Sequence, residues 1–446
     1  MANTSLTWTP SGAGNQQKTT LSMWLKKSVA SNAGYVFEVN DGSNQFVIRE
    51  SNAQLKFWHF SGSAYDWEAE MTPLLRDVNG WYNFVMSIDT TQSTLANRLK
   101  CWLNGVSQTV TFTSGSSNLS QNSNWIFNKN STHRWGRADN SYWNGSMSHL
   151  HQTDGYCYDA STFGSIDNTT GEWQINAAPT IANYGTNGYF ILKDGNSVTD
   201  QSPNTNNFTV ATGTLTKSED NPSNVFATLN PLDKAIVGTQ PTIANGNLKW
   251  TASGNSSSNG GIRGTIGASS GKFYYEAKLT TQNQTMLGYH LDGVTPYFDG
   301  TGYIGASSKG FYGIYSDSGT AYAIVNGTNQ NNNLGSISDN DIIGVAFDLD
   351  NGKYYFSKNG SWLNSGSPTS GSTGTGSFGN LPSGTYVPIL GNASWTFASS
   401  AELNFGNGYF GTTAVSSAGT NASGNGIFEY DVPTGFTALS TKGLNL

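Results

Sequence analysis

Two glutamates form the best candidate for catalytic chemistry in this chain. Glu68 and Glu70 stand two residues apart in the stretch WEAEM, residues 67–71. On a β-strand such residues share one face about 6.5 to 7 Å apart, and paired carboxylates at this separation can serve glycoside hydrolysis. No third acidic residue follows in register, because Met71 and Thr72 occupy the next positions. We therefore expect a solvated strand face and no enzyme, with a glycan-degrading enzyme as the alternative.

Candidate metal ligands are sparse. The histidines include one pair, His149 and His151, which has no third ligand at a usual spacing, so we expect both at the surface as ordinary polar residues. Asp41, Asp139 and Asp350 lie near turns and could coordinate calcium with neighbouring amide and carbonyl oxygens. Aspartate is also common in turns for its backbone conformation. We expect no cofactor, keep calcium as an alternative, and assign no metal ligands.

Aromatic residues interleaved with amides and arginines are the remaining chemical signal. Sugar rings have apolar faces that stack on aromatic planes, while amides and guanidinium groups bond to sugar hydroxyls. Most of these aromatic side chains are expected in the core, and those in the loop DNSYWNG, residues 139–145, are the better candidates. The predicted glycan-binding residues are Trp58, Trp67, Trp135, Arg137, Tyr142 and Trp143.

The elements that position these side chains are predicted to be β-strands. Residues 80–106 alternate apolar and polar side chains in two runs joined by a polar link, and then reach Asn104-Gly105, a dipeptide that favours a tight turn. Residues 341–360 repeat this pattern around the turn Asp350-Asn351-Gly352. The sequence thus predicts an all-β protein of two antiparallel, jelly-roll-like β-sandwiches joined by an irregular connector.

Composition excludes several classes of protein. The chain has 446 residues, 53 of them glycine, with 11% charged and 13% aromatic residues and a net charge of −7. Lysine and arginine are scattered, so we expect no nucleic-acid binding. No apolar run reaches the roughly 18 to 20 residues of a membrane span, and we expect neither membrane insertion nor a signal peptide. Two cysteines indicate no disulfide framework, and Cys101 is expected as a buried free thiol.

The first part of the chain resembles a known family. The runs GWYNFVMSIDTT, RLKCWLNGV and RWGRADNSYWNGSMSHLHQTDGYCYDASTFG are similar to the laminin-G-like, concanavalin-A-like lectin fold, over residues 1–165. Residues 166–232 are expected as an irregular connector with a short hairpin at GYFILKDG. From its STFG start to NVFATLNPLD, this connector resembles the one that follows the lectin-like domain in structural proteins of tailed bacteriophages, especially phages of marine bacteria.

The second part resembles another family. The order SGKFYYEAKL, NDIIGVAFDLDNGKYYFSKNG, YVPIL and ELNFG is similar to the SPRY family, a bent β-sandwich, over residues 233–408. The C-terminal tail, residues 409–446, is similar to the endings of marine phage appendage proteins. Its aromatic residues suggest docking on the rest of the chain.

These resemblances imply a function. They indicate a virion structural protein of a tailed phage, as a tail fibre, head fibre or capsid decoration, that is made in the host cytoplasm and present in many copies or as a homo-oligomer. Its loops would bind a host-surface glycan or receptor, and avidity would come from the array. Its partners would be other virion proteins. A purely structural protein that joins capsid or tail subunits is a further alternative.

Overall fold

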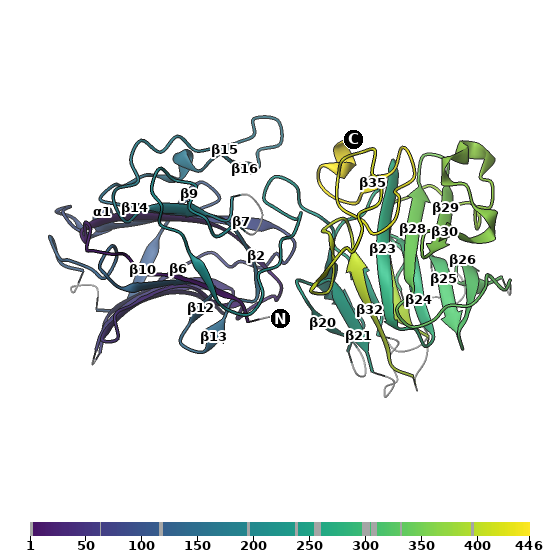
Figure 1. Ribbon diagram of the computed structural model, residues 1–446, viewed down its shortest axis with the longest axis horizontal. Coiled ribbons are helices and arrows are strands. Elements are labelled where there is room, and N and C mark those ends of the chain that lie inside the picture. Colours follow the sequence, from purple (N-terminus) through teal and green to yellow (C-terminus); the bar gives the residue numbers. More distant parts are fainter. Residues whose placement is uncertain are drawn as a thin grey trace. The chain divides into compact units, whose positions relative to one another are not determined.

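The computed structural model describes residues 3–62, 64–115, 119–193, 197–236, 240–253, 260–296, 304, 310–330, 332–393 and 397–446. This part of the chain is built from strands with almost no helix, so the all-β prediction is confirmed. The chain divides into two compact units (Figure 1). Unit 1 comprises Met1–Lys217 with Asn221–Ser223, and unit 2 comprises Ser218–Asp220 with Asn224–Leu446.

Unit 1 contains two large antiparallel sheets, which face each other as the layers of a sandwich (Figure 1). In spatial order, the eight-stranded sheet consists of β10 (Val110–Ser114), β6 (Tyr65–Met71), β5 (Gln54–Ser61), β4 (Asn44–Ser51), β3 (Gly34–Asn40), β11 (Thr132–Trp135), β1 (Ser5–Trp8) and β18 (Thr209–Thr212). The six-stranded sheet consists of β17 (Tyr189–Ile191), β14 (Gly145–Asp154), β2 (Lys18–Lys27), β7 (Trp81–Asp89), β8 (Leu99–Leu103) and β9 (Val106–Gln108). The shorter elements are β12 (Arg137–Ala138), β13 (Ser141–Tyr142), β15 (Gly164–Ile166), β16 (Trp173–Ile175), α1 (Leu95–Arg98) and η2 (Ala160–Thr162).

The core of unit 1 forms where apolar residues of the two sheets meet. Phe57 on β5 and Phe84 on β7 are both fully buried, and their ring centroids lie 6.4 Å apart across the sandwich. Because alternate strand residues point to one face, every second residue of these strands enters this core. Cys101 on β8 is buried and free, as the sequence predicts. The turn after β8 uses Asn104 and Gly105 at φ of 47° and 76°, the backbone that the Asn-Gly pair favours.

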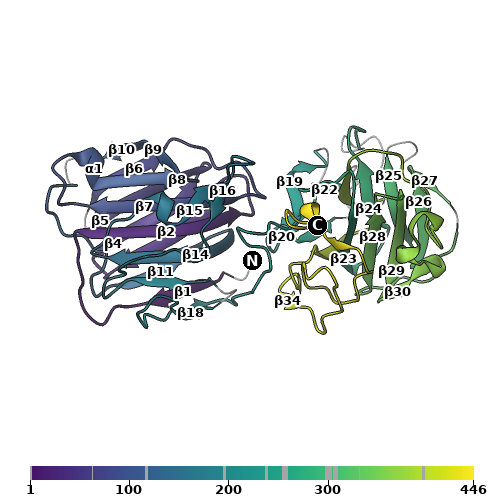
Figure 2. The same ribbon diagram turned by 90° about the horizontal axis from the view of Figure 1, so that it is seen from above.

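Residues 166–217 contribute to the sheets of unit 1. β17 pairs with β14 at one edge of the six-stranded sheet, and β18 pairs with β1 at one edge of the eight-stranded sheet. The β15–β16 pair covers the outer face of the six-stranded sheet (Figure 2), where Trp173 Nε1 donates to Asn83 Oδ1 at 3.1 Å. The division between the units therefore falls near residues 217–224, beyond the expected boundary at residue 165. The reason is that edge strands of unit 1 take partners from this segment.

Unit 2 also contains two large sheets. In spatial order, the first consists of β19 (Leu229–Lys234), β22 (Ile262–Gly264), β31 (Tyr386–Asn392), β24 (Thr285–Leu291), β25 (Phe311–Asp317), β26 (Thr320–Val325) and β27 (Thr328–Asn329). The second consists of β20 (Thr242–Ala244), β21 (Lys249–Ala252), β32 (Ser399–Asn404), β23 (Lys272–Thr281), β28 (Ile342–Asp348), β29 (Lys353–Lys358) and β30 (Ser361–Trp362), and β35 (Thr437–Ala438) joins β23. The shorter elements are β33 (Tyr409–Phe410), β34 (Thr413–Ala414), η3 (Leu363–Ser365), η4 (Pro368–Thr373) and η5 (Gly443–Asn445).

The C-terminal segment of unit 2 is docked on the central strand β23. β35 pairs with β23 in parallel, and Phe428 and Phe436 pack in a buried cluster with Tyr274. Glu276 on β23 is fully buried and accepts hydrogen bonds from the backbone N–H groups of Glu429 and Tyr430, each at 2.9 Å. One buried carboxylate thus holds the backbone of the last segment against the sheet. None of the helices in the described ranges is long and apolar enough to cross a membrane.

Candidate functional site

A pocket of about 360 Å³ opens on the outer face of the eight-stranded sheet of unit 1. It lies between strands β3 and β4 and the β12–β13 hairpin, which stands outside the sheet (Figure 1). Its lining combines aromatic, amide, hydroxyl and charged groups from Asn32, Gly34, Tyr35, Arg49, Glu50, Ser51, Ser141, Tyr142 and Asn144. Small-molecule sites typically combine a concave shape with a few convergent polar groups, so this pocket is the candidate functional site.

Backbone contacts fix the hairpin over β3. Gly136 donates its N–H to the Val36 carbonyl at 2.8 Å, and Asn144 donates to the Ala33 carbonyl at 2.6 Å. Gly34 is needed at this contact, because its φ is +99° and a Cβ there would lie 2.2 Å from the Tyr142 carbonyl oxygen. The close approach of these two backbones places Tyr142 at the pocket wall.

A β-bulge brings Tyr35 to the pocket. In the β3–β4 ladder Tyr35 pairs with Arg49 and Phe37 with Ile48, so Val36 is an additional residue on β3. Val36 is fully buried in the core of the sandwich. A bulge redirects the neighbouring side chains, and Tyr35 therefore shares the outer face with Arg49 and not the inner face with Phe37.

Arg49 holds a guanidinium group against two aromatic rings at the pocket. Its Cζ atom lies 5.9 Å from the Tyr35 ring centroid and 5.1 Å from that of Trp58. The Nε atom is enclosed and finds no hydrogen-bond partner in the part of the chain that the structure describes. The rings thus fix the guanidinium by cation–π contacts and leave hydrogen-bond donors for a ligand.

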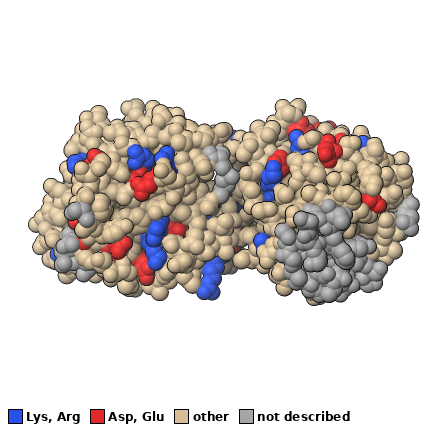
Figure 3. Space-filling model, turned by 90° about the horizontal axis from the view of Figure 1, so that it is seen from below, with Lys and Arg blue, Asp and Glu red and all other residues tan. Residues whose placement is uncertain are grey.

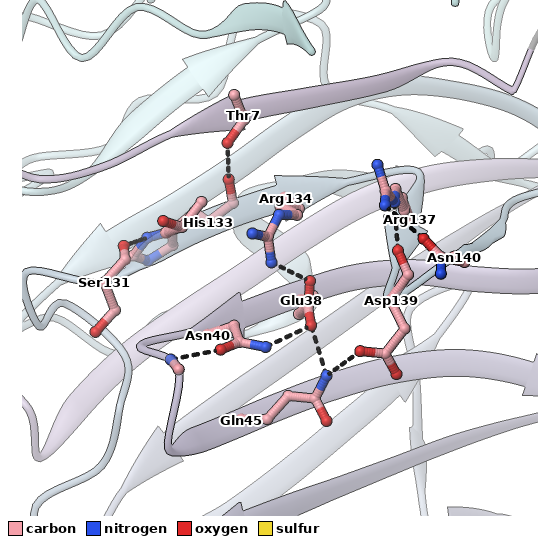
Figure 4. Close-up of polar contacts among 12 residues, drawn as sticks. Thr7, Glu38, Asn40, Gln45, Ser131, His133, Arg134, Arg137, Asp139 and Asn140 are labelled. Carbon is pink, nitrogen blue, oxygen red and sulfur yellow. Dashed lines mark hydrogen bonds and ion pairs between the residues drawn. The ribbon is translucent and has the colours of Figure 1, made fainter. Parts of the chain in front are cut away.

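A second arginine supports the hairpin side of the pocket. Arg137 Cζ lies 5.3 Å from the Tyr142 ring centroid, and the guanidinium donates to the Asp139 carbonyl and to Asn140 Oδ1 (Figure 4). These contacts order both the β12–β13 turn and the Tyr142 ring. Arg137 is partly exposed, and its hydrogen bonds go to a carbonyl and an amide oxygen, so its charge is not neutralised by either.

Beneath the hairpin, the carboxylate of Glu38 is fully compensated. Arg134 Nη1 lies 2.6 Å from Glu38 Oε2, while Asn40 and Gln45 donate their side-chain amides to Glu38 Oε1 at 3.0 and 2.5 Å (Figure 4). Gln45 also reaches Asp139 Oδ1 at 3.5 Å and so connects the sheet to the hairpin turn. This network positions the hairpin and adds no uncompensated negative charge below it.

The predicted glycan-binding residues separate into two groups. Trp67 and Trp135 are each 1% exposed in the core, and Trp135 Nε1 donates to the Tyr189 hydroxyl at 2.9 Å. Trp143 and Trp58 are 8% and 9% exposed, so protein atoms cover most of both rings. Tyr142 lines the pocket, with Arg137 over its ring. Of the predicted residues, Tyr142 alone lines the pocket. Arg137 contacts the Tyr142 ring and Trp58 contacts Arg49, whereas Trp67 and Trp135 lie inside the sandwich.

Glu68 and Glu70 lie on the outer face of β6, as their alternation with buried Trp67 and Ala69 requires. Glu70 Oε2 forms an ion pair of 2.7 Å with Lys56 Nζ on β5. This contact engages one of the two carboxylates that a glycosidase mechanism would use. Neither glutamate lines the pocket.

The expectation that His149 and His151 lie at the surface is wrong. Both are buried, and the register of β14 against β2 shifts between Ser148 and His151, with His149 at a φ of +49°. His151 packs on Phe190, with ring centroids 3.8 Å apart, and burial lowers its pKa well below the usual value. The described residues contain no group of three or more His, Cys, Asp or Glu side chains that could hold a metal ion.

The turn aspartates make hydrogen bonds that stabilise turns. Asp41 accepts from the backbone of Asn44 at 2.7 Å and lies 2.5 Å from Lys129 Nζ. Asp350 accepts from the Gly271 N–H at 2.7 Å. Asp139 contacts Gln45, as described above. Calcium binding by these residues stays an alternative.

Tyr142 is the only one of the nine lining residues that was among the predicted site residues. Of the residues that were missed, Tyr35 and Arg49 supply the aromatic ring and the guanidinium group on the sheet side. Arg49 carried a usable signal, because Phe46 and Ile48 of the same strand alternate with Val47 and Arg49, which places the arginine on the outer face. Tyr35 carried no such signal, since alternation from Phe37 places it in the core. Only the bulge at Val36 reverses that assignment.

The surface of unit 1 carries few charges. On the face of the molecule drawn in Figure 3, most of the described surface of unit 1 is uncharged, and positive and negative side chains are interspersed. An arginine without an ion-pair partner therefore stands out among these groups.

Comparison with known proteins identifies one region of the chain. Residues 272–381 match the SPRY domain model. The match lies within unit 2 and covers strands β23 to β30, so the C-terminal part of the predicted resemblance is confirmed. SPRY domains are β-sandwich domains that mediate protein–protein interaction.

Solved structures similar to this chain include two SPRY domains. The SPRY domain of human HERC1 is 15% identical, with a TM-score of 0.29, and the match covers 39% of this chain and 96% of that one. The TRIM65 PSpry domain is 16% identical, with a TM-score of 0.30, and the match covers 40% of this chain and 91% of that one. No curated protein matches the chain.

Proposed function

We propose that this protein binds carbohydrate through the pocket of unit 1, and that it does so as a multicopy structural protein of a tailed-phage virion. The observation that carries the binding proposal is the pocket lining, in which Tyr35, Tyr142 and Arg49 converge with the amides of Asn32 and Asn144. Aromatic faces suit the apolar faces of sugar rings, and amide groups suit sugar hydroxyls. The virion role rests on the resemblance of the connector and tail to phage appendage proteins.

In this proposal unit 2 contacts another protein and does not bind the glycan. Its SPRY match supports a contact with another protein, for which a neighbouring virion protein is the natural partner. A single sugar site binds weakly, so the particle would reach useful affinity through many copies that engage a host surface together. The protein would be made in the host cytoplasm and would reach the surface as part of the particle.

Glycan binding can be tested directly with the full chain. We expect the labelled protein to bind a subset of a microarray of bacterial surface glycans. Tyr142→Ala should abolish that binding, because it removes an aromatic wall of the pocket. Tyr156→Ala is the matched control, since Tyr156 is 40% exposed in unit 1 and does not line the pocket. If the array shows no binding, or if both variants bind alike, the proposed glycan site is wrong.

The same preparation separates binding from the enzymatic alternative. Incubation with the bound polysaccharide should release no reducing ends. Release that disappears in Glu68→Gln would instead favour a glycan-degrading enzyme. The virion role is tested by immunogold labelling of phage particles that carry this chain: label at regular positions on the capsid or tail supports it, and unlabelled particles contradict it.

A further inference from the structure

We infer that the ligand of the unit 1 pocket is an acidic saccharide whose carboxylate binds the guanidinium of Arg49. This inference rests on the proposed carbohydrate-binding function and adds the chemical class of the sugar. It starts from the charges at the site. Arg49 lines the pocket and forms no ion pair with any residue of the described ranges.

The carboxylate that lines the pocket is already compensated. Glu50, the only carboxylate in the pocket lining, is fully buried as a side chain and forms an ion pair with Lys27. Lys56 on β5 lies opposite Arg49 in the β4–β5 ladder, and it forms an ion pair of 2.7 Å with Glu70 on β6. The opposite charges within each of these ion pairs cancel, so Arg49 leaves a net positive charge on the sheet side of the pocket.

The geometry of Arg49 favours a planar anion. A guanidinium group presents its N–H donors in a rigid fork that matches a carboxylate bidentately, and it cannot lose its proton at ordinary pH. Tyr35 and Trp58 already hold this fork in place, so little side-chain entropy remains to be lost on binding. Because Nε is enclosed by protein atoms, the carboxylate would bind the terminal Nη groups of this fork.

The hairpin side of the pocket reinforces this preference. Arg137 lies over the Tyr142 ring, and it donates hydrogen bonds to a carbonyl and an amide oxygen. A sugar ring placed between Tyr35 and Tyr142 would therefore have a guanidinium group near each aromatic wall. In a chain of net charge −7, this concentration of positive charge distinguishes an acidic sugar from a neutral one.

The test compares matched pairs of ligands on the full chain. The probes are oligosaccharides that contain glucuronate, galacturonate or mannuronate, each beside the same oligosaccharide with its carboxyl groups reduced to alcohols. Calorimetric titration should show at least about tenfold tighter binding of one acidic member than of its reduced counterpart, as expected for a charge-assisted bidentate contact. Raising the NaCl concentration should weaken binding of the acidic member and leave the reduced one almost unchanged.

Variants then assign the preference to Arg49. Arg49→Gln should remove the difference between acidic and reduced ligands, while Arg76→Gln, at an exposed arginine outside the pocket, should preserve it. If the wild type binds both members of each pair equally, or prefers the reduced one, the acidic class is wrong and carbohydrate binding stands. If it binds no member of any pair and no neutral glycan of the array, the proposed function itself is wrong. The salt dependence of the wild type decides the case even if Arg49→Gln does not fold.

Discussion

Lys27 and Glu50 form an enclosed ion pair below the pocket, with 3.6 Å between Lys27 Nζ and Glu50 Oε1 and both side chains fully buried. Glu50 also accepts N–H groups of Ala33 and Asn32, and Lys27 Nζ donates to the Ala30 carbonyl at 2.8 Å. Burial lowers the pKa of Lys27, against the opposing effect of the Glu50 charge. The pair therefore holds residues 30–33, which include the pocket residue Asn32, against strands β2 and β4.

Removal of one partner of this ion pair should lower the free energy of unfolding. Lys27→Met leaves the Glu50 carboxylate buried without its counter-charge, which typically costs about 3–5 kcal/mol of unfolding free energy. Urea unfolding should show this loss, and hydrogen exchange should show faster exchange in residues 28–34. The double variant Lys27→Met with Glu50→Gln should recover part of it. Lys100→Met, at an exposed lysine of β8, should change the unfolding free energy by less than about 0.5 kcal/mol.

Because Gly34 lies against the β12–β13 hairpin, a methyl group added at this position should disturb the pocket. Gly34→Ala should lower the melting temperature and abolish glycan binding, because the added Cβ would overlap the Tyr142 carbonyl oxygen and φ is +99°. Gly42 is the matched control, with φ of +91° and no atom within 4 Å of an added Cβ. Gly42→Ala should carry only the backbone penalty, about 1–2 kcal/mol, and retain binding. Equal effects of the two substitutions would contradict the close hairpin contact.

Glu276 predicts a pH dependence of the stability of unit 2. Burial raises its pKa to about 7 from the ordinary value of 4.5, although the N–H groups of Glu429 and Tyr430 oppose this shift. A carboxyl group with a raised folded-state pKa binds more protons when folded, so its stabilising contribution is complete below pH 4.5 and is lost as the pH rises through 7. The loss should approach about 3 kcal/mol.

Unfolding of the full chain measured between pH 4.5 and 8.5 would detect this effect. Glu276→Gln should flatten the pH dependence of the transition that belongs to unit 2, whatever its effect on absolute stability. If the unfolding free energy of unit 2 depends on pH equally in the wild type and in Glu276→Gln, another group causes the dependence.

The two cysteines should differ in reactivity. Cys101 is fully buried, and burial raises its pKa. Cys157 is an exposed residue, although burial also raises the pKa of its thiol, which donates to the Ile88 carbonyl at 3.2 Å; access of the reagent therefore distinguishes the two cysteines. A thiol reagent should therefore modify Cys157 alone in the native protein, and Cys101 only after unfolding. Native Cys157→Ser should be unreactive, and mass spectrometry of the modified peptides would check both assignments.

Local alternation was enough to predict much of the fold. The strands β7 and β8, the Asn104-Gly105 turn and the buried thiol of Cys101 all follow from residues that are close in sequence. The same holds for β28 and β29 in unit 2. The positions of Trp67 and Trp135 were harder to predict, because an aromatic residue suits both a core and a sugar site, and only packing shows which face of its strand is enclosed.

The pocket itself was decided by tertiary structure. The sequence determined that unit 1 is a sandwich of alternating strands, and this alternation places Arg49 on an outer face. It did not determine that Val36 would bulge into the core and turn Tyr35 toward Arg49. Nor did it determine that residues 136–144 would fold back over Gly34, since this contact depends on backbone hydrogen bonds between residues about 100 positions apart. Alternation acts between neighbouring residues, whereas a bulge and a docked hairpin depend on what the rest of the sheet presents.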